Sequence, residues 1–177
     1  MAVPGEELSD ADMLILEAAI GARQLTEEEL RQVAEHVAQA GFPPTIGRAT
    51  GLAGLTWEGR ILRGSDELTA AERHYLRHVI NVNEWPEGTT LEEYVGSISQ
   101  VVMDGHTGIF TSRYQGQWQI GFVRRSGDLL GPSGSEWVLV EYRLDIGHWV
   151  TAYQPVEGLG VIEGPGRENI GWQRRPQ

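Results

Sequence analysis

The sequence contains no cysteine and no lysine. The absence of cysteine excludes a disulfide framework, a thiolate metal site and a thiol nucleophile. Every fixed positive charge is an arginine, whose planar guanidinium can hold a phosphate through two parallel hydrogen bonds. No apolar run reaches the roughly 18 residues that a membrane-spanning helix needs. The N-terminus is acidic and lacks a basic leader, so we expect no ordinary signal peptide. We expect the protein in the cytoplasm of the producing cell or of a target cell.

The charge of the chain is strongly negative, with a formal net charge of −11 over 177 residues. Residues 1–69 contribute −7, from 5 Arg against 12 Asp and Glu, and residues 70–177 contribute −4, from 9 against 13. An acidic protein has no long-range attraction to nucleic acid, which argues against a broad nucleic-acid-binding surface. A small site in which a few arginines face a phosphate is still compatible with this charge.

Helix signals precede strand signals along the chain. Possible N-caps at Ser9, Thr26, Thr69 and Thr90 predict helices over 9–22, 26–40, 69–82 and 90–103. From residue 108 onward the pattern alternates, which predicts strands over 108–114, 117–124, 137–143 and 148–154. This order indicates an α+β fold, with N-terminal helices followed by a helix packed on an antiparallel sheet of four to five strands.

The domain organisation follows from the same pattern. We expect a helical preface and irregular linker over 1–66, with a short hairpin within 55–62. The α+β core is expected over 67–158. Residues 159–177 are rich in glycine and are predicted to be a weakly structured tail, in which 160–163 is either a strand or disordered.

Two histidines, His74 and His78, lie four residues apart on one predicted helix and therefore share a face. A zinc site would need a third ligand, such as His106, His148 or a carboxylate, and the hydrolytic zinc motif is absent. Alternatively, one imidazole is a general acid or base. His78 is the better candidate, because it follows Arg77 at the edge of the apolar stripe. A solvated or core-edge histidine is the structural alternative, and we predict no metal.

Thr151 and Tyr153 lie two residues apart on the last predicted strand, so both hydroxyls project from one face. There they could bind a phosphate oxygen or stabilise charge in a transition state. Good strand propensity alone also explains both residues. Arg125 and Arg143 lie on strands or at strand ends and are candidates for phosphate binding, with surface charges as the alternative.

Three carboxylates near the last hairpin, Glu136, Glu141 and Asp145, invite comparison with the acid pair of a glycosidase. Their positions predict the exterior of the hairpin, away from the histidines. We therefore do not favour a glycosidase.

Residues 68–155 resemble a known family through four short motifs: Glu-Arg-His-Tyr-Leu-Arg-His-Val at 72–79, Thr-Thr-Leu-Glu-Glu-Tyr at 89–94, Val-Leu-Val-Glu-Tyr-Arg at 138–143 and Val-Thr-Ala-Tyr-Gln-Pro at 150–155. This stretch resembles the toxin domains of bacterial polymorphic and contact-dependent inhibition systems. It is most similar to the metal-independent ribonucleases grouped with barnase, EndoU, colicins and RelE, or to related RNase A-like toxins.

The resemblance implies a helix bearing a catalytic histidine, packed on a sheet whose late strand carries a Thr and a Tyr. It implies RNA cleavage through a 2′,3′-cyclic phosphate without a cofactor, with RNA such as tRNA as substrate and an immunity protein as partner. It also implies delivery to the cytoplasm of a target cell within a secreted toxin. Our alternative is an inert α+β binding module that presents its acidic residues 1–35 to a basic protein. The expected catalytic residues are His78, Thr151 and Tyr153, and the expected phosphate-binding residues are Arg77, Arg125 and Arg143.

Overall fold

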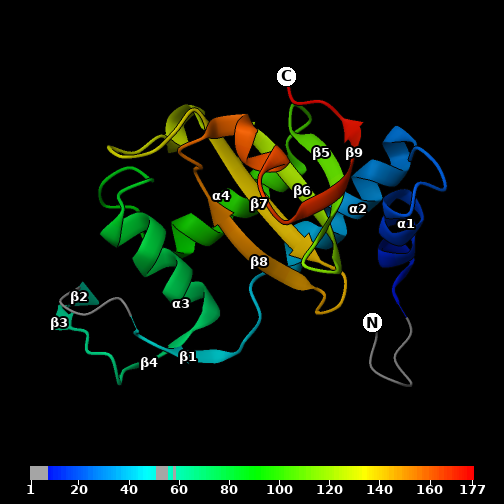
Figure 1. The fold of residues 1–177 in the computed structure, drawn as a ribbon. Coiled ribbons are helices and arrows are strands. Elements are labelled where there is room, and N and C mark those ends of the chain that lie inside the picture. Colours follow the sequence, from blue (N-terminus) through cyan, green and yellow to red (C-terminus); the bar gives the residue numbers. More distant parts are fainter. Residues whose placement is uncertain (1–7, 51–55, 58) are drawn as a thin grey trace.

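The computed structural model describes residues 8–50, 56–57 and 59–177, and it confirms the predicted α+β fold (Figure 1). All four predicted helices are present. The α-helices are α1 (Asp10–Ala19), α2 (Glu27–Ala40), α3 (Ala70–Tyr75) and α4 (Leu91–Met103). A π-helical segment, η1 (Leu76–Asn81), continues α3, and two short 3-10 helices, η2 (Gly127–Leu129) and η3 (Gly158–Glu163), follow later.

Five antiparallel strands form the main sheet in the order β8-β7-β6-β5-β9. These strands are β5 (Gly108–Tyr114), β6 (Gln117–Arg125), β7 (Trp137–Arg143), β8 (His148–Tyr153) and β9 (Arg167–Arg174). Strands β5 to β8 form a meander, and β9 returns to pair with β5 at the opposite edge from β8. The sequence therefore placed these four strands correctly.

The prediction of a weakly structured tail over 159–177 is wrong. Residues 158–163 form η3 rather than a strand, and Arg167–Arg174 forms β9. This strand has few apolar side chains and is partly exposed along most of its length, because it is an edge strand. An edge strand without a fully buried face has no clear period-2 pattern in its sequence.

Two small antiparallel strand pairs precede α3, and the second pair lies between the strands of the first in the sequence. β1 (Ile46–Arg48) pairs with β4 (Glu67–Thr69), and β2 (Thr56–Trp57) pairs with β3 (Arg60–Ile61). The second pair agrees with the hairpin predicted within 55–62, of which residues 55 and 58 lie outside the described residues. Figure 1 shows these strand pairs on the same side of the molecule as α3, away from the main sheet.

Helices cover one face of the sheet, where the main core lies (Figure 1). Ile120, Val140 and Trp149 point from three strands into this core, and all are at most 1% exposed. The buried polar atoms of its aromatic residues have partners, for example Trp149 Nε1, which donates to the Val37 carbonyl at 2.7 Å. Side chains of α1 and α2 belong to the same cluster, so the predicted helical preface packs directly on the sheet.

A smaller cluster covers part of the opposite face beneath η3, formed by Phe110, Leu139 and Ile162 with their neighbours. A Cβ at Gly121 would lie 2.3 Å from the ring of Phe110, so only glycine leaves room for that ring. Elsewhere on this face, Gln119, Glu141 and Thr151 border a hollow. Within the described part of the chain, no helix is long and apolar enough to cross a membrane.

Candidate functional site

The α3–η1 helix positions the two histidines. It starts with a capping box, in which Thr69 Oγ1 accepts from the Glu72 amide at 3.2 Å while Glu72 Oε1 accepts from the Thr69 amide at 2.9 Å. This reciprocal pair satisfies two amides that a helix start leaves without partners. The capped turn fixes where the helix begins and therefore which side chains face the sheet.

The π-helical segment then widens the last turn of this helix. The Val82 amide donates to the Arg77 carbonyl at 2.9 Å, and the Glu84 amide donates to the His78 carbonyl at 2.8 Å. These bonds span five and six residues instead of the four of an α-helix. The wide turn brings Glu84 back beneath His78, a contact that no local sequence signal predicted.

His78 is held by a buried carboxylate. Its Nδ1 lies 2.9 Å from Oε2 of Glu84, and the two side chains are 12% and 7% exposed. The other carboxylate oxygen of Glu84, Oε1, accepts a hydrogen bond from the backbone amide of Gln154 at 2.6 Å. This bond connects the His78–Glu84 pair to the end of β8. With Nδ1–H donating to the carboxylate, Nε2 is the ring nitrogen left to exchange protons with a ligand.

Tyr153 lies next to His78, with their ring centroids 5.7 Å apart. Burial, assisted by the nearby Glu141 carboxylate, raises the pKa of Tyr153 to about 12. The phenol therefore keeps its proton at neutral pH and can donate a hydrogen bond. Thr151 is paired across the strands with Glu141 and lies with Tyr153 on the face opposite the helices.

His74 has a different environment from His78. Its ring stacks on Phe42 at 4.4 Å and lies 5.9 Å from the ring of His78. Burial, and then the positive charges of His78, Arg73 and Arg77, lower its pKa to about 4. His74 is therefore neutral near pH 7 and acts as an aromatic support beneath its neighbour.

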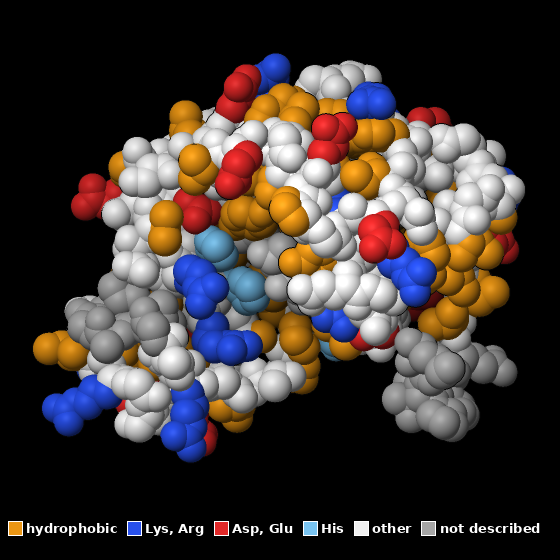
Figure 2. All heavy atoms as spheres, in the orientation of Figure 1, with side chains coloured by type: hydrophobic (Ala, Val, Ile, Leu, Met, Phe, Trp, Pro, Cys, Tyr) orange, Lys and Arg blue, Asp and Glu red, His pale blue; other side chains and the backbone are white. Residues whose placement is uncertain are grey.

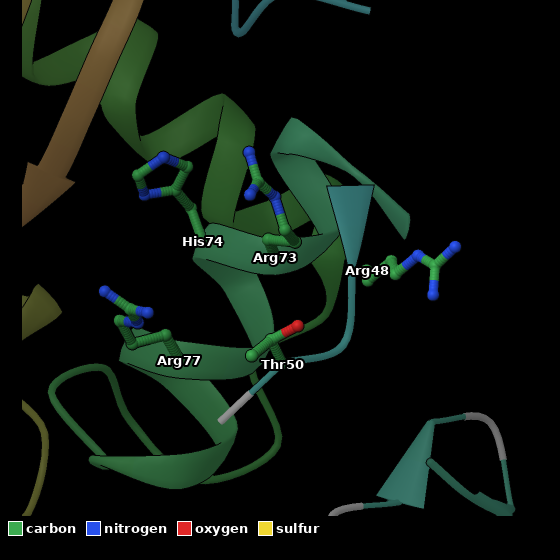
Figure 3. Close-up of a pocket in the computed structure, with 5 residues that line it drawn as sticks. All are labelled: Arg48, Thr50, Arg73, His74 and Arg77. Carbon is green, nitrogen blue, oxygen red and sulfur yellow. The ribbon is translucent and has the colours of Figure 1, made fainter. Parts of the chain in front are cut away.

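Three arginines border a cavity of about 410 Å³ that includes His74. Figure 3 shows Arg73 and Arg77 on the same helix as His74, Thr50 after β1, and Arg48 on β1 with its side chain turned away from the others. None of these guanidinium groups forms an ion pair with a carboxylate of the described residues. Unpaired arginines around one cavity provide local positive charge in an acidic protein.

The surface view shows the same arrangement. In Figure 2, two histidine side chains lie side by side in a hollow of this face, with arginines next to them. In the same orientation, the ribbon shows the helix bearing the histidines beside the main sheet (Figure 1).

The two other predicted phosphate-binding arginines have carboxylate partners. Arg125 pairs with Glu136 and stacks over Trp137 at 4.6 Å, and it borders neither the cavity at His74 nor the open sheet face. Arg143 forms two hydrogen bonds with Asp145, at 2.9 and 2.6 Å. Of the predicted arginines, the structure thus brings only Arg77 near the histidines.

The position of Glu141 differs from our expectation of a hairpin exterior. Glu141 is only 6% exposed, and its carboxylate forms an ion pair with Arg167 of β9. Burial raises the pKa of this carboxyl group. The expectation failed because β9, which supplies Arg167, was not recognised in the sequence. In the described part of the chain, no three His, Asp or Glu side chains are grouped so as to hold a metal ion.

Comparisons with known proteins give no relative: no family model, curated protein or solved structure matches this chain.

Proposed function

We propose that this protein is a ribonuclease that cleaves RNA through a 2′,3′-cyclic phosphate without a metal ion. The observation that carries the proposal is the contact between His78 and Tyr153 beside the arginine-lined cavity. His78 is oriented by the buried Glu84 at 2.9 Å, and Tyr153 meets its ring from the sheet at 5.7 Å. An oriented imidazole next to a protonated phenol suits proton transfer at a phosphate.

The reaction needs only one proton to be moved. Nε2 of His78 accepts the proton of the ribose 2′-hydroxyl, and the 2′-oxygen attacks phosphorus. The bond between phosphorus and the 5′-oxygen breaks, and the imidazolium returns the proton to that oxygen. Tyr153 donates a hydrogen bond to a non-bridging oxygen, while Arg77 and Arg73 neutralise the phosphate charge.

The alternative of an inert binding module would scatter these side chains or bury them as core. The closeness of His78, Tyr153 and the free arginines favours the enzyme over the module. Following the resemblance, we also propose an immunity protein as a partner and a delivered toxin as the context. Co-expression with neighbouring small reading frames, scored by rescue of growth, tests that partner.

The test is incubation of the purified protein with total tRNA and ribosomal RNA, with and without EDTA. We expect cleavage in both conditions and fragments that end in a 2′,3′-cyclic phosphate, detected by ³¹P NMR. Cleavage that requires added zinc or magnesium, or no cleavage of either RNA, would contradict the proposal.

A further inference from the structure

A second hollow lies on the open face of the sheet, next to Tyr153. It has a volume of about 580 Å³ and is bordered by β6, β7, β8 and the segment that leads into β9. This volume falls within the range of roughly 300–1,000 Å³ that is typical of small-molecule sites. Because Tyr153 borders this hollow and also contacts His78, the hollow adjoins the proposed site of cleavage.

Three polar groups at this hollow are buried without complete hydrogen bonding. Gln119 is 2% exposed, and its Oε1 has no partner. Glu141 Oε1 lies 2.5 Å from Arg167 Nη1 in an ion pair, and it has no further partner. Arg167 Nε is also without an acceptor. Buried polar groups are rarely left in this state, because each one costs free energy unless a partner satisfies it.

We propose that this hollow binds a nucleobase with an exocyclic amino group: the base of the nucleotide whose phosphate lies at His78. The inference rests on the proposed function. An amino group has two N–H bonds, which match Gln119 Oε1, an acceptor without a partner, and the second lone pair of Glu141 Oε1, whose first partner is Arg167. The ring nitrogen or carbonyl beside that amino group accepts from Arg167 Nε. Adenine, cytosine and guanine have this pattern, whereas uracil has no amino group.

The charge and walls of the hollow favour a neutral planar ligand. Glu141 and Arg167 have opposite charges, so the floor of the hollow attracts a phosphate less than the cavity bordered by Arg73 and Arg77 does. Tyr114 and Tyr153 supply aromatic surface, and the Arg167 guanidinium lies 5.8 Å from the centre of the Tyr114 ring. Aromatic and guanidinium planes are the surfaces on which bases stack.

Binding of the four nucleoside 3′-monophosphates to the ¹⁵N-labelled protein tests the proposal, since these nucleotides contain no phosphodiester bond that the protein could cleave. We expect the adenosine, cytidine and guanosine nucleotides to bind at least about tenfold more tightly than the uridine nucleotide, the scale of one buried hydrogen bond. The side-chain amide signals of Gln119 should shift on binding.

Gln119→Leu should abolish this preference, whereas Gln119→Glu, which keeps an acceptor, should retain it. Gln100→Leu is the control, because Gln100 is an exposed glutamine on α4. Equal affinity for the uridine nucleotide, or a preference that survives Gln119→Leu, would overturn the base pocket. Cleavage of RNA by the unaltered protein is scored separately. A base preference without RNA cleavage would therefore refute the proposed ribonuclease activity and still support the base-binding hollow.

Discussion

His74 and His78 lie one helical turn apart, but their rings have different surroundings and therefore different chemical roles. His78 has a hydrogen-bonded carboxylate on one nitrogen and a tyrosine against its ring. His74 is stacked between Phe42 and His78, with a pKa lowered to about 4. The sequence could not separate the two by spacing, because both lie on one helix face. The distinction comes from Phe42 and Glu84, whose approach depends on the tertiary fold.

Replacing His78 by asparagine should stop cleavage and keep the fold. The asparagine amide nitrogen can take the place of Nδ1 toward Glu84, whereas alanine would leave that buried carboxylate short of a partner at about 1–3 kcal/mol. We expect cleavage to fall by about 10²- to 10⁴-fold, with the free energy of unfolding changed by less than about 1 kcal/mol. The control is His106→Asn, since the His106 side chain is 71% exposed. Full activity of His78→Asn would refute the assignment.

The low pKa of His74 should make the protein less stable in acid. In the folded state His74 titrates at about 4, against 6.5 for an unperturbed histidine. Keeping it neutral therefore contributes stability above pH 6.5, which is lost as the pH falls from 6.5 to 4, because only the unfolded chain binds the proton there. The contribution is at most about 3 kcal/mol. Urea unfolding at pH 7 and pH 4.5 measures it.

His74→Phe is the matched variant for that measurement, because phenylalanine keeps the stack on Phe42 and cannot titrate. We expect the loss of stability between pH 7 and pH 4.5 to be smaller in this variant than in the parent protein. An identical loss in both proteins would mean that carboxylates elsewhere account for the whole acid sensitivity.

At the scale of the elements, β9 is more important than its sequence indicates. It covers the second hydrophobic cluster through Trp172, whose ring lies 5.3 Å from that of Phe110, and it supplies Arg167 to Glu141. Trp172→Ala should lower the free energy of unfolding by about 2 kcal/mol, since it removes a large, partly buried aromatic. The control is the exposed Glu168→Ala on the same strand. Equal melting of both variants would show that β9 contributes little.

Most helices and strands could be predicted from signals within a few neighbouring residues. The strand β9 and the contacts between distant segments could not. The capping boxes at Thr26, Thr69 and Thr90 are complete within three residues, so they could be read from the sequence. The meander strands β5, β6 and β7 each contain five or six consecutive buried residues, which stand out in the sequence as apolar segments between turns. β9 has no buried residue, and the partnerships Glu84–His78 and Glu141–Arg167 depend on segments that meet only in the fold.

At the scale of the whole molecule, a net charge of −11 limits how RNA can be held. Among the described residues, the arginines that border the cavity at His74 are Arg48, Arg73 and Arg77, and none of them pairs with a described carboxylate. With about three phosphate contacts on a single strand, the logarithm of the association constant should fall with the logarithm of salt concentration with a slope of about −2. Binding of an oligonucleotide to His78→Asn protein at several salt concentrations gives this slope.

Arg73→Gln should reduce the magnitude of that slope by about 0.7, because it removes one contact. Arg31→Gln is the control, since Arg31 lies on α2 and already pairs with Glu28 and Glu35. A slope far steeper than −2 would indicate a broad basic surface, and a slope near zero would mean that these arginines do not touch phosphate.

The wide turn of η1 should leave a trace in homologous sequences. A π-helical segment holds one residue more than the α-helical turn it replaces, so it corresponds to a single-residue insertion between 76 and 81. A chain without that residue would close this turn as an α-helix and lose the wide turn that places Glu84 beneath His78. In an alignment of homologues, chains with a one-residue gap between positions 76 and 81 should therefore also lack the equivalent of His78 or of Glu84. Chains without the gap should keep both.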